Sequence, residues 1–296
     1  METIYSVLIF IIVLILYSQI IFQLKKGDDI EIYETDYTSN KDINANANLK
    51  QPFVFRFDDA NLKTAPLSKM VADHGSFDIF VKEIADYHAD KPPTSVVLTL
   101  NAAHSLMKTD TESKYFSSGN QYFIEETGIK RYYQQLDKYL EPALSVFSNY
   151  DLLIGSAGVM TPLTYHTFER RYIYITGGKY EVKMTPWRST KYMVVNKNYR
   201  DYEFSSPLNV WSPQDTAYSK MKFVEFSVEA GQVVYIPPFW HYSLKMVGED
   251  DDHVCHVFDY SSPMNILSNA FSITNHLFEK YGPKAGPKEE GKITTI

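Results

Sequence analysis

The longest hydrophobic pattern of the chain lies near its start, where residues 4–22 carry no charged side chain. A run of this length matches the helix that crosses the hydrocarbon core of a bilayer. A cleaved signal peptide has a basic segment before a shorter apolar run, whereas Glu2 is the only charged residue before this one. The pattern therefore predicts a single-pass transmembrane anchor over residues 1–24.

The charges that flank this run predict the side of the membrane on which the rest of the chain lies. Lys25 and Lys26 follow the run directly, and no lysine or arginine precedes it. Because basic residues stay on the cytoplasmic side, we expect the C-terminal body to face the cytoplasm. An unglycosylated, reducing compartment agrees with two further features. Cys255 is the only cysteine, and no asparagine begins an Asn-x-Ser/Thr sequence.

Polarity changes after the anchor and divides the remaining chain into three parts. Residues 25–51 are polar and show no periodicity, which predicts a flexible tether. Residues 52–281 contain repeated apolar-rich segments and predict the folded domain. Residues 282–296 are rich in glycine, proline and charged side chains, so we expect a disordered tail.

Helical spacing of apolar residues occurs mainly in the first half of this domain. It predicts helices over residues 77–89 and 128–147, and a further helix over residues 264–281 near the C-terminus. The second of these carries an apolar stripe that we interpret as core packing: Tyr132, Tyr133, Leu136, Tyr139 and Leu140. The first two helices would form an N-terminal helical annex.

From Asp151 onward the pattern changes to alternation, which is typical of β-strands. Gly177-Gly178 separates two apolar-rich strands and predicts a two-residue hairpin. Residues 253–260 predict a final alternating strand. Aromatic residues make up 15% of the chain, as a β-rich fold favours. The domain is thus expected to be mainly β with α.

The stretch Gly231–Leu244 has the most specific pattern of this β-rich half. Val233–Ile236 predicts a short strand, and Pro237 and Pro238 end it because proline cannot donate to a sheet ladder. His241 then opens a new strand next to a tryptophan. A short strand, a rigid proline corner and a histidine therefore follow one another directly.

This order resembles the last metal-ligand segment of the Jumonji C and cupin-like family of iron- and 2-oxoglutarate-dependent hydroxylases. Thr161–His166, with the sequence TPLTYH, is similar to the family's Thr-Pro-small-His-x-Asp run. The resemblance extends over residues 52–260. It implies a double-stranded β-helix (cupin or jelly-roll) barrel, here with a helical annex and one N-terminal transmembrane helix.

The family holds iron with a His-x-Asp pair and a distant histidine, which leaves positions open for oxygen and 2-oxoglutarate. In the matching positions this chain has Thr164, His166 and His241, respectively. Threonine is a neutral, weak metal ligand, and the lost carboxylate no longer offsets the charge of Fe(II). The resemblance therefore implies a family member with a degraded metal motif.

Two histidines alone form a weak metal site, and the final strand offers a third. Alternation places His256 on one face with two apolar residues, so we expect it to point into the barrel. One hypothesis is a metal site of His166, His241 and His256, because imidazole binds Fe, Zn, Cu and Ni. The alternative is that these are hydrogen-bonded interior histidines of a filled barrel.

The family also uses a lysine just after the hairpin to pair with the distal carboxylate of 2-oxoglutarate. Lys179 lies almost at this position, but the better match places Tyr180 there and turns Lys179 to solvent. That match requires one extra residue, a bulge, within Thr167–Tyr174. Thr161 is the one contact to the keto acid that matches without adjustment.

Composition excludes several other functions. The net charge of −7 and the lack of a lysine and arginine cluster argue against nucleic acid as a partner. The chain has no glycine-rich phosphate loop and no Gly-x-Ser-x-Gly sequence. Cys255 lies among apolar residues and is expected to be buried and inert.

Three hypotheses of function remain. The first is a membrane-anchored, catalytically degenerate oxygenase homologue that binds or scaffolds a protein partner. The second is an active Fe(II)- and 2-oxoglutarate-dependent hydroxylase with atypical ligands and a protein substrate. The third is a structural membrane protein of a large virus particle.

Overall fold

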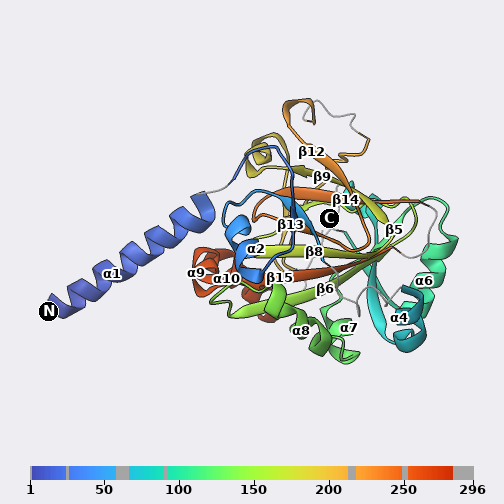
Figure 1. Cartoon of the computed structure of the whole chain (residues 1–296), viewed down its shortest axis with the longest axis horizontal. Helices are drawn as coiled ribbons and strands as arrows, with labels where there is room; N and C mark the ends of the chain where they lie inside the picture. The colour runs from blue at the N-terminus through green and yellow to red at the C-terminus, as the bar shows by residue number, and fades with distance from the viewer. Residues whose placement is uncertain are drawn as a thin grey trace, which may run out of the picture.

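The computed structural model describes residues 2–24, 27–57, 67–89, 93–212, 218–248 and 253–282. Within these ranges two β-sheets face each other, and helices cover the outer face of the larger sheet (Figure 1). Helix α1 (Glu2–Gln19) projects away from the rest of the molecule and continues into the short π-helix η1 (Ile20–Leu24).

The larger sheet has nine strands in the described part of the chain. Their spatial order is β1 (Tyr33–Asp36), β2 (Phe53–Arg56), β13 (Gln232–Ile236), β8 (Arg170–Gly177), β15 (Val254–Ser261), β6 (Phe147–Gly155), β5 (Tyr115–Ser117), β3 (Asp78–Glu83) and β4 (Ser95–Thr99). Only β1 and β2 run parallel, and the other neighbours are antiparallel.

The smaller sheet is antiparallel and has six strands in the described part. Their order is β10 (Asn196–Asn198), β11 (Glu203–Ser206), β7 (Leu163–Tyr165), β14 (His241–Val247), β9 (Lys179–Thr185) and β12 (Val224–Glu229). No strand pairing joins the two sheets within the described ranges, so they form an open two-sheet jelly roll rather than a closed barrel. The expected class, mainly β with α and a jelly-roll core, is confirmed.

Alternation along the strands fills the space between the sheets with apolar side chains. Ile173 and Val257 from the larger sheet meet Val182, Leu244 and other residues of the smaller sheet in one buried cluster. Removal of the apolar surface of these side chains from water is the main stabilising contribution of such a cluster. The region between the sheets is therefore a packed core over most of its length.

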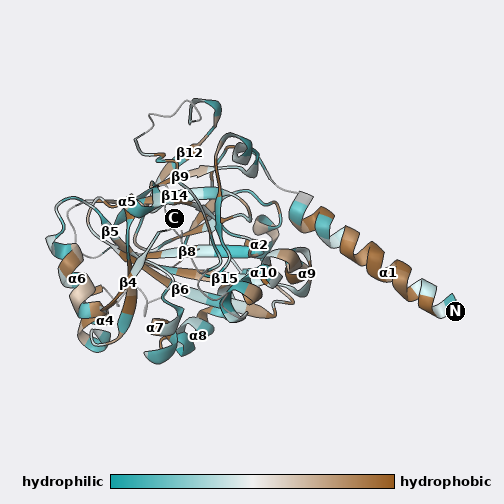
Figure 2. Cartoon of the chain, turned by 180° about the vertical axis from the view of Figure 1, so that it is seen from behind, coloured by the Kyte–Doolittle hydropathy of each residue, from teal (hydrophilic) through white to brown (hydrophobic). Residues whose placement is uncertain are grey.

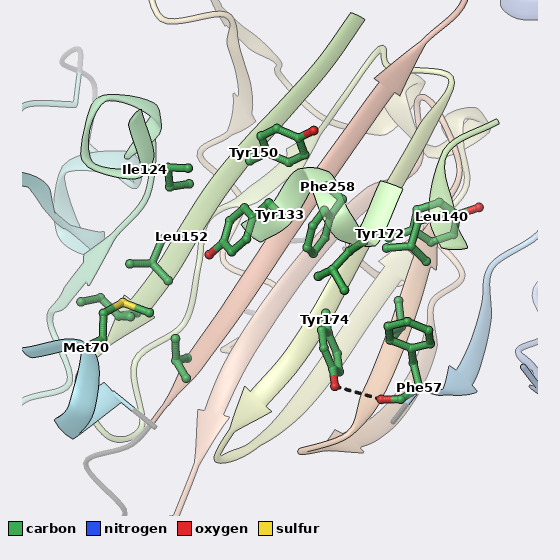
Figure 3. Close-up of a cluster of buried hydrophobic side chains, with 14 of the residues drawn as sticks. Phe57, Met70, Ile124, Tyr133, Leu140, Tyr150, Leu152, Tyr172, Tyr174 and Phe258 are labelled. Atoms are coloured by element: carbon green, nitrogen blue, oxygen red, sulfur yellow. Dashed lines mark hydrogen bonds between the residues drawn. The ribbon is translucent and has the colours of Figure 1, made fainter. Parts of the chain in front are cut away.

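A second cluster lies on the outer face of the larger sheet, beneath the helices (Figure 3). Its helical side chains include Tyr133 and Leu140 of α8, which pack against Phe258 and Tyr172 of the sheet. The helices are α2 (Asn40–Ala47), α4 (Leu67–His74), α5 (Ile84–Tyr87), α6 (Leu100–Thr109), α7 (Gln121–Glu126), α8 (Lys130–Leu140), α9 (Pro263–Ser268) and α10 (Ala270–Tyr281), with 3-10 turns η2 (Trp187–Tyr192) and η3 (Tyr218–Lys220). The central strands of the larger sheet are thus buried on both faces.

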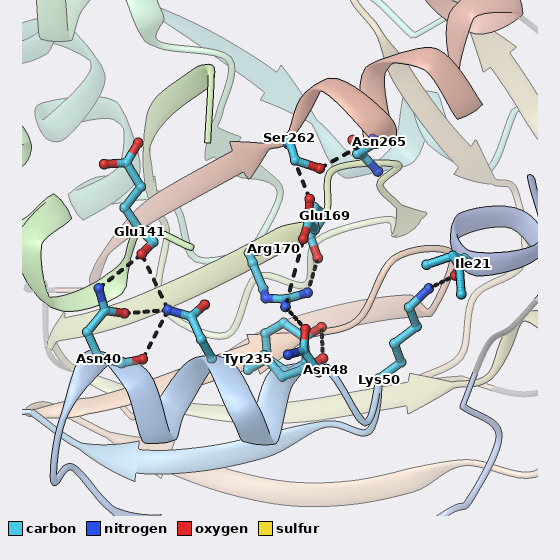
Figure 4. A network of polar contacts seen from close by, with 12 residues as sticks. Ile21, Asn40, Asn48, Lys50, Glu141, Glu169, Arg170, Tyr235, Ser262 and Asn265 are labelled. Atoms are coloured by element: carbon cyan, nitrogen blue, oxygen red, sulfur yellow. Dashed lines mark hydrogen bonds and ion pairs between the residues drawn. The ribbon is translucent and has the colours of Figure 1, made fainter. Parts of the chain in front are cut away.

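The prediction of a flexible tether over residues 25–51 is wrong for residues 33–47, where the structure has β1 and α2. Ser39 caps α2 by accepting a hydrogen bond from the backbone of Asp42. Ile43 and Ala47 are the only two buried residues of α2, too few for a periodic pattern, and asparagines bond the helix to its neighbours (Figure 4). The asparagine-rich composition reflects side-chain hydrogen bonding here.

Two predictions of secondary structure in the annex have different outcomes. Residues 78–83 form strand β3 rather than the predicted helix, and only the four residues of α5 follow as a helical turn. Pairing of β3 with both β4 and β5 supplies tertiary hydrogen bonds that outweigh local helical spacing. The stripe on α8 does pack into the core, as predicted.

The predicted hairpin at Gly177-Gly178 is also wrong, because β8 and β9 belong to opposite sheets. Gly178 has φ of +76° and forms the corner at which the chain passes from one sheet to the other. The pairing of β8 with β15 shifts register at Thr176, so β8 has a bulge just outside the range Thr167–Tyr174 in which one was predicted. The local sequence predicts the turn correctly, but it does not show that the two strands on either side belong to different sheets.

The C-terminal helix is present as α9 and α10, which meet at Asn269. Of the predicted tail, residues 283–296 lie outside the described part of the chain. The described chain has one helix long and apolar enough to cross a bilayer, spanning Glu2–Gln23, and very little of it is buried against the body. Figure 2 shows the hydrophobic colour along α1.

Candidate functional site

An ion pair lies between the two sheets near the start of β8. Arg171 Nε lies 2.6 Å from Asp259 Oδ1, and Nη2 lies 2.7 Å from Oδ2, so the guanidinium binds both carboxylate oxygens. The Asp259 side chain is only 1% exposed. Asn149 Nδ2 donates a further hydrogen bond to Asp259 Oδ2 at 3.3 Å. This bidentate geometry is the strongest that a carboxylate and a guanidinium form.

Tyr242 completes the contacts of this guanidinium from the smaller sheet. Arg171 Nη1 donates to the Tyr242 hydroxyl at 2.7 Å. Burial disfavours the charged guanidinium, but Asp259 and Tyr242 outweigh that effect and raise the pKa of Arg171. A permanent positive charge therefore bridges the two sheets.

His166 lies beside this positive charge. Its Nε2 is 2.9 Å from the carbonyl oxygen of Ile236, so Nε2 carries the proton and donates it, which leaves only Nδ1 for a metal. Burial, followed by the charge of Arg171, lowers the pKa of His166 well below its ordinary value of 6.5. We call Arg171, Asp259, Tyr242 and His166 the Arg171 cluster.

His241 does not join this cluster, so the proposed match to the family's distant histidine is wrong. Tyr242 pairs with Thr164 across β14 and β7 and faces the inter-sheet space. His241 precedes Tyr242 in the same strand and therefore points to the opposite face. There its ring lies 5.0 Å from that of Tyr165, and burial lowers its pKa to about 4.

His256 also lies away from the cluster, and the expectation that it points between the sheets is wrong. It faces the helical layer, where the Tyr133 hydroxyl contacts Nδ1 and Thr176 Oγ1 lies 2.9 Å from Nε2. Burial lowers its pKa to about 3. Both ring nitrogens are used by the fold. The structure therefore does not bring together His166, His241 and His256.

The residues expected to bind 2-oxoglutarate are likewise dispersed. Thr161 Oγ1 accepts a hydrogen bond from the backbone of Leu244 at 2.9 Å, so its hydroxyl links two segments of the smaller sheet. Tyr180 is fully buried in the inter-sheet core with its hydroxyl beside the Cys255 thiol, and burial raises its pKa. Lys179 is exposed, as the alignment with Tyr180 predicted.

The Arg171 cluster does not fit Fe(II). Its only carboxylate, Asp259, is already neutralised by a bidentate guanidinium, and the same guanidinium lowers the basicity of His166. Thr164, at the position of the family's first histidine, offers a neutral hydroxyl. In the described ranges, no three histidine, cysteine, aspartate or glutamate side chains converge in a way that could hold a metal ion. Because the Arg171–Asp259 pair has no net charge, it supplies no free negative charge to offset an added divalent cation.

Sequence reasoning missed Arg171, Asp259 and Tyr242. Arginine at the start of a strand that is otherwise apolar was the available signal, because a charged side chain on a doubly buried strand needs a partner. Asp259 has the same signal on β15, whose eight residues are all buried. Because β8 and β15 are neighbours and Arg171 lies opposite Asp259, knowledge of this strand pairing would have suggested the ion pair.

The family model of the cupin-like domain matches residues 26–271, which contain every strand of both sheets. No curated protein matches the chain at a significant level. The matched range starts after η1 and ends within α10, and it includes the segment that sequence patterning had assigned to a tether. The two facing sheets are those expected of this domain. The chain therefore belongs to the cupin-like family of Jumonji C type.

Proposed function

We propose that this chain is a membrane-anchored cupin-like protein that has lost Fe(II) and 2-oxoglutarate chemistry and acts as a binding or scaffolding module for a protein partner. The observation that supports this most strongly is the position of Arg171. Its guanidinium hydrogen-bonds Tyr242, the cross-strand neighbour of Thr164, and lies close enough to His166 to lower its pKa. The Arg171 guanidinium thus lies next to the positions that match the metal ligands of the family.

Further support comes from the hydrogen bonds that Arg171 and Asp259 already make within this region. Asp259 accepts bonds from Arg171 and Asn149, and Arg171 also donates to Tyr242. Binding of a metal through Asp259 would require this buried pair to break, which costs several kcal/mol. The module would therefore bind its protein partner through its surface rather than act through a metal centre.

Membrane anchoring is the second part of the proposal and rests on α1. Its apolar side chains are exposed almost throughout, as for a helix that lies in lipid. With Lys25 and Lys26 after the run, the body would lie on the cytoplasmic side. A protein partner on that side is then accessible to the anchored module.

The test uses purified full-length protein in detergent, titrated anaerobically with Fe(II) and then supplied with oxygen, ascorbate and 2-oxoglutarate. We expect no stoichiometric Fe(II) binding and no succinate formation above the level of a boiled sample. Wild-type turnover that disappears in His166→Ala or His241→Ala, with Lys179→Ala as the exposed control, would contradict the proposal and favour an active hydroxylase. Recovery of the protein within purified virus particles would instead favour a structural role.

A further inference from the structure

Helix α10 turns a row of large apolar side chains to solvent. None of its residues is buried, although it is twelve residues long. The exposed side chains and their exposed fractions are Phe271 (77%), Leu277 (50%), Phe278 (71%) and Tyr281 (72%). Exposed apolar residues gathered in this way mark a surface that contacts another apolar phase.

A second group of exposed apolar side chains lies in the loop between α8 and β6 and at the first residue of β6. Its members are Leu144 (83%), Val146 (61%) and Phe147 (47%). The backbone of Val146 donates to the carbonyl oxygen of Ser261 at 3.0 Å. Ser261 lies two residues before α9, so this hydrogen bond holds the loop at the start of α9. Helix α10 begins two residues after the end of α9.

The end of the proposed anchor is fixed at the same place. Gln19 Nε2 donates to the carbonyl oxygen of Ser268 at 3.0 Å, and Gln23 Nε2 donates to Asn269 Oδ1 at 2.7 Å. Lys50 also contacts the carbonyl oxygen of Ile21 (Figure 4). Figure 1 shows α9 and α10 on the side of the body from which α1 projects.

Distances along the chain make this arrangement compact. The six residues of α9 span about 9 Å at the rise of an α-helix. The loop therefore lies at one end of α9, and the junction with α10 lies at the other end, against the last turn of α1. The polar Gln19 and Gln23 mark the level at which the apolar run ends, so the junction of α9 and α10 lies at that same level.

We propose that Leu144, Val146, Phe147 and the exposed residues of α10 form a membrane-facing rim that enters the headgroup region of the bilayer spanned by α1. This inference rests on the proposed anchor. Aromatic and apolar side chains on one face of a helix are the usual means of binding such an interface. The rim would hold the body against the membrane in one orientation instead of leaving it free on a single helix.

The rim also fixes which part of the jelly roll lies near the lipid. Phe147 stacks on Phe168 with ring centroids 6.3 Å apart, and the Arg171 guanidinium lies 5.4 Å from the Phe168 ring. The end of the inter-sheet space that contains the Arg171 cluster is therefore next to the rim. Figure 1 shows α6 on the side of the body opposite to α1, so a membrane-facing rim would turn α6 away from the lipid.

The experiment places a fluorescent label on full-length protein reconstituted in phosphatidylcholine vesicles. Thr274→Cys puts the label on exposed α10, and Ser105→Cys puts it on exposed α6 as the matched control. Native Cys255 is fully buried and does not compete for the label. The vesicles contain lipids with a nitroxide quencher near the headgroup. We expect at least twofold quenching of the α10 label and no quenching of the α6 label.

Two surface variants test the rim itself. Phe271→Ser with Phe278→Ser should abolish the quenching of the α10 label, whereas Val96→Ser with Val97→Ser, which alters exposed apolar residues of β4, should leave it unchanged. Protein that resists an alkaline wash but shows no quenching overturns the rim and leaves the anchor intact. Protein that the wash removes overturns the anchor. Energy transfer between labelled copies without quenching assigns the rim to a second copy and also overturns the inference.

Discussion

Removal of the guanidinium from the Arg171 cluster should destabilise the body strongly. Arg171→Met keeps most of the side-chain volume but leaves the Asp259 carboxylate, which is 1% exposed, with only a long hydrogen bond of 3.3 Å from the Asn149 side chain. Loss of one partner of a buried ion pair typically costs about 3–5 kcal/mol, because the remaining charge stays buried without compensation. We expect a loss of this size in the free energy of unfolding.

Two further variants separate the buried charge from the loss of a side chain. Arg56 and Glu229 form a pair at 3.3 Å with side chains 71% and 59% exposed, so Arg56→Met should cost less than about 1 kcal/mol. Asp259→Asn in the Arg171→Met background removes the uncompensated charge and should recover at least half of the loss. Recovery would show that the charge, and not the packing of the arginine stem, determines the cost.

Urea unfolding of full-length protein in detergent, followed by tryptophan fluorescence, provides the free energies from the midpoint and slope. If Arg171→Met costs no more than Arg56→Met, the pair is hydrated and the reasoning is refuted. A hydrated Arg171 would then present no obstacle to a metal at this position. A full loss that Asp259→Asn does not recover would refute the electrostatic explanation alone.

Three other predictions follow from burial and charge. Burial lowers the pKa of His256 to about 3, so the neutral form is favoured in the folded state and stability is lost as pH falls below the unfolded pKa of about 6.5. Wild type should therefore lose roughly 2–3 kcal/mol more than His256→Gln between pH 7 and pH 4.5 in urea titrations, because only about two pH units lie between the unfolded pKa and pH 4.5; equal losses would show that His256 is hydrated. Trp240 is fully buried and donates to the carbonyl oxygen of Gly27 at 3.1 Å, so Trp240→Ala should cost about 3–5 kcal/mol by the same assay, and a loss below about 1 kcal/mol would contradict its burial. Protease outside intact cells should leave residues 50–296 undigested, whereas their digestion would reverse the proposed orientation.

Sequence patterning predicted the parts of the fold that depend on local order along the chain. The two strands and the proline corner of Gly231–Leu244 are present as β13, β14 and the turn between them, which contains the buried Trp240. The apolar stripe of α8 is in the core. The resemblance to the cupin-like family is confirmed by the match over residues 26–271. These features need only short segments and their sequence order.

Patterning failed where long-range pairing overrides local spacing. Residues 78–83 have helical spacing but form β3, because β4 and β5 complete its hydrogen bonds from both sides. Gly177 and Gly178 mark a turn, but the strands on either side pair with distant partners in different sheets. Hydrogen bonds of α2 to distant residues likewise order a segment whose composition alone predicted disorder.

The sequence by itself determined which residues of a strand share a face, and only the tertiary structure decided where that face points. On β15, alternation separates His256 from Asp259 correctly, but all eight residues of the strand are buried. One face packs on the helices and the other on the smaller sheet, so apolar neighbours do not identify the inner face. The same ambiguity placed His241 where Tyr242 lies. A strand that is buried on both faces carries no hydrophobic contrast, and its orientation is set by the layers that pack against it.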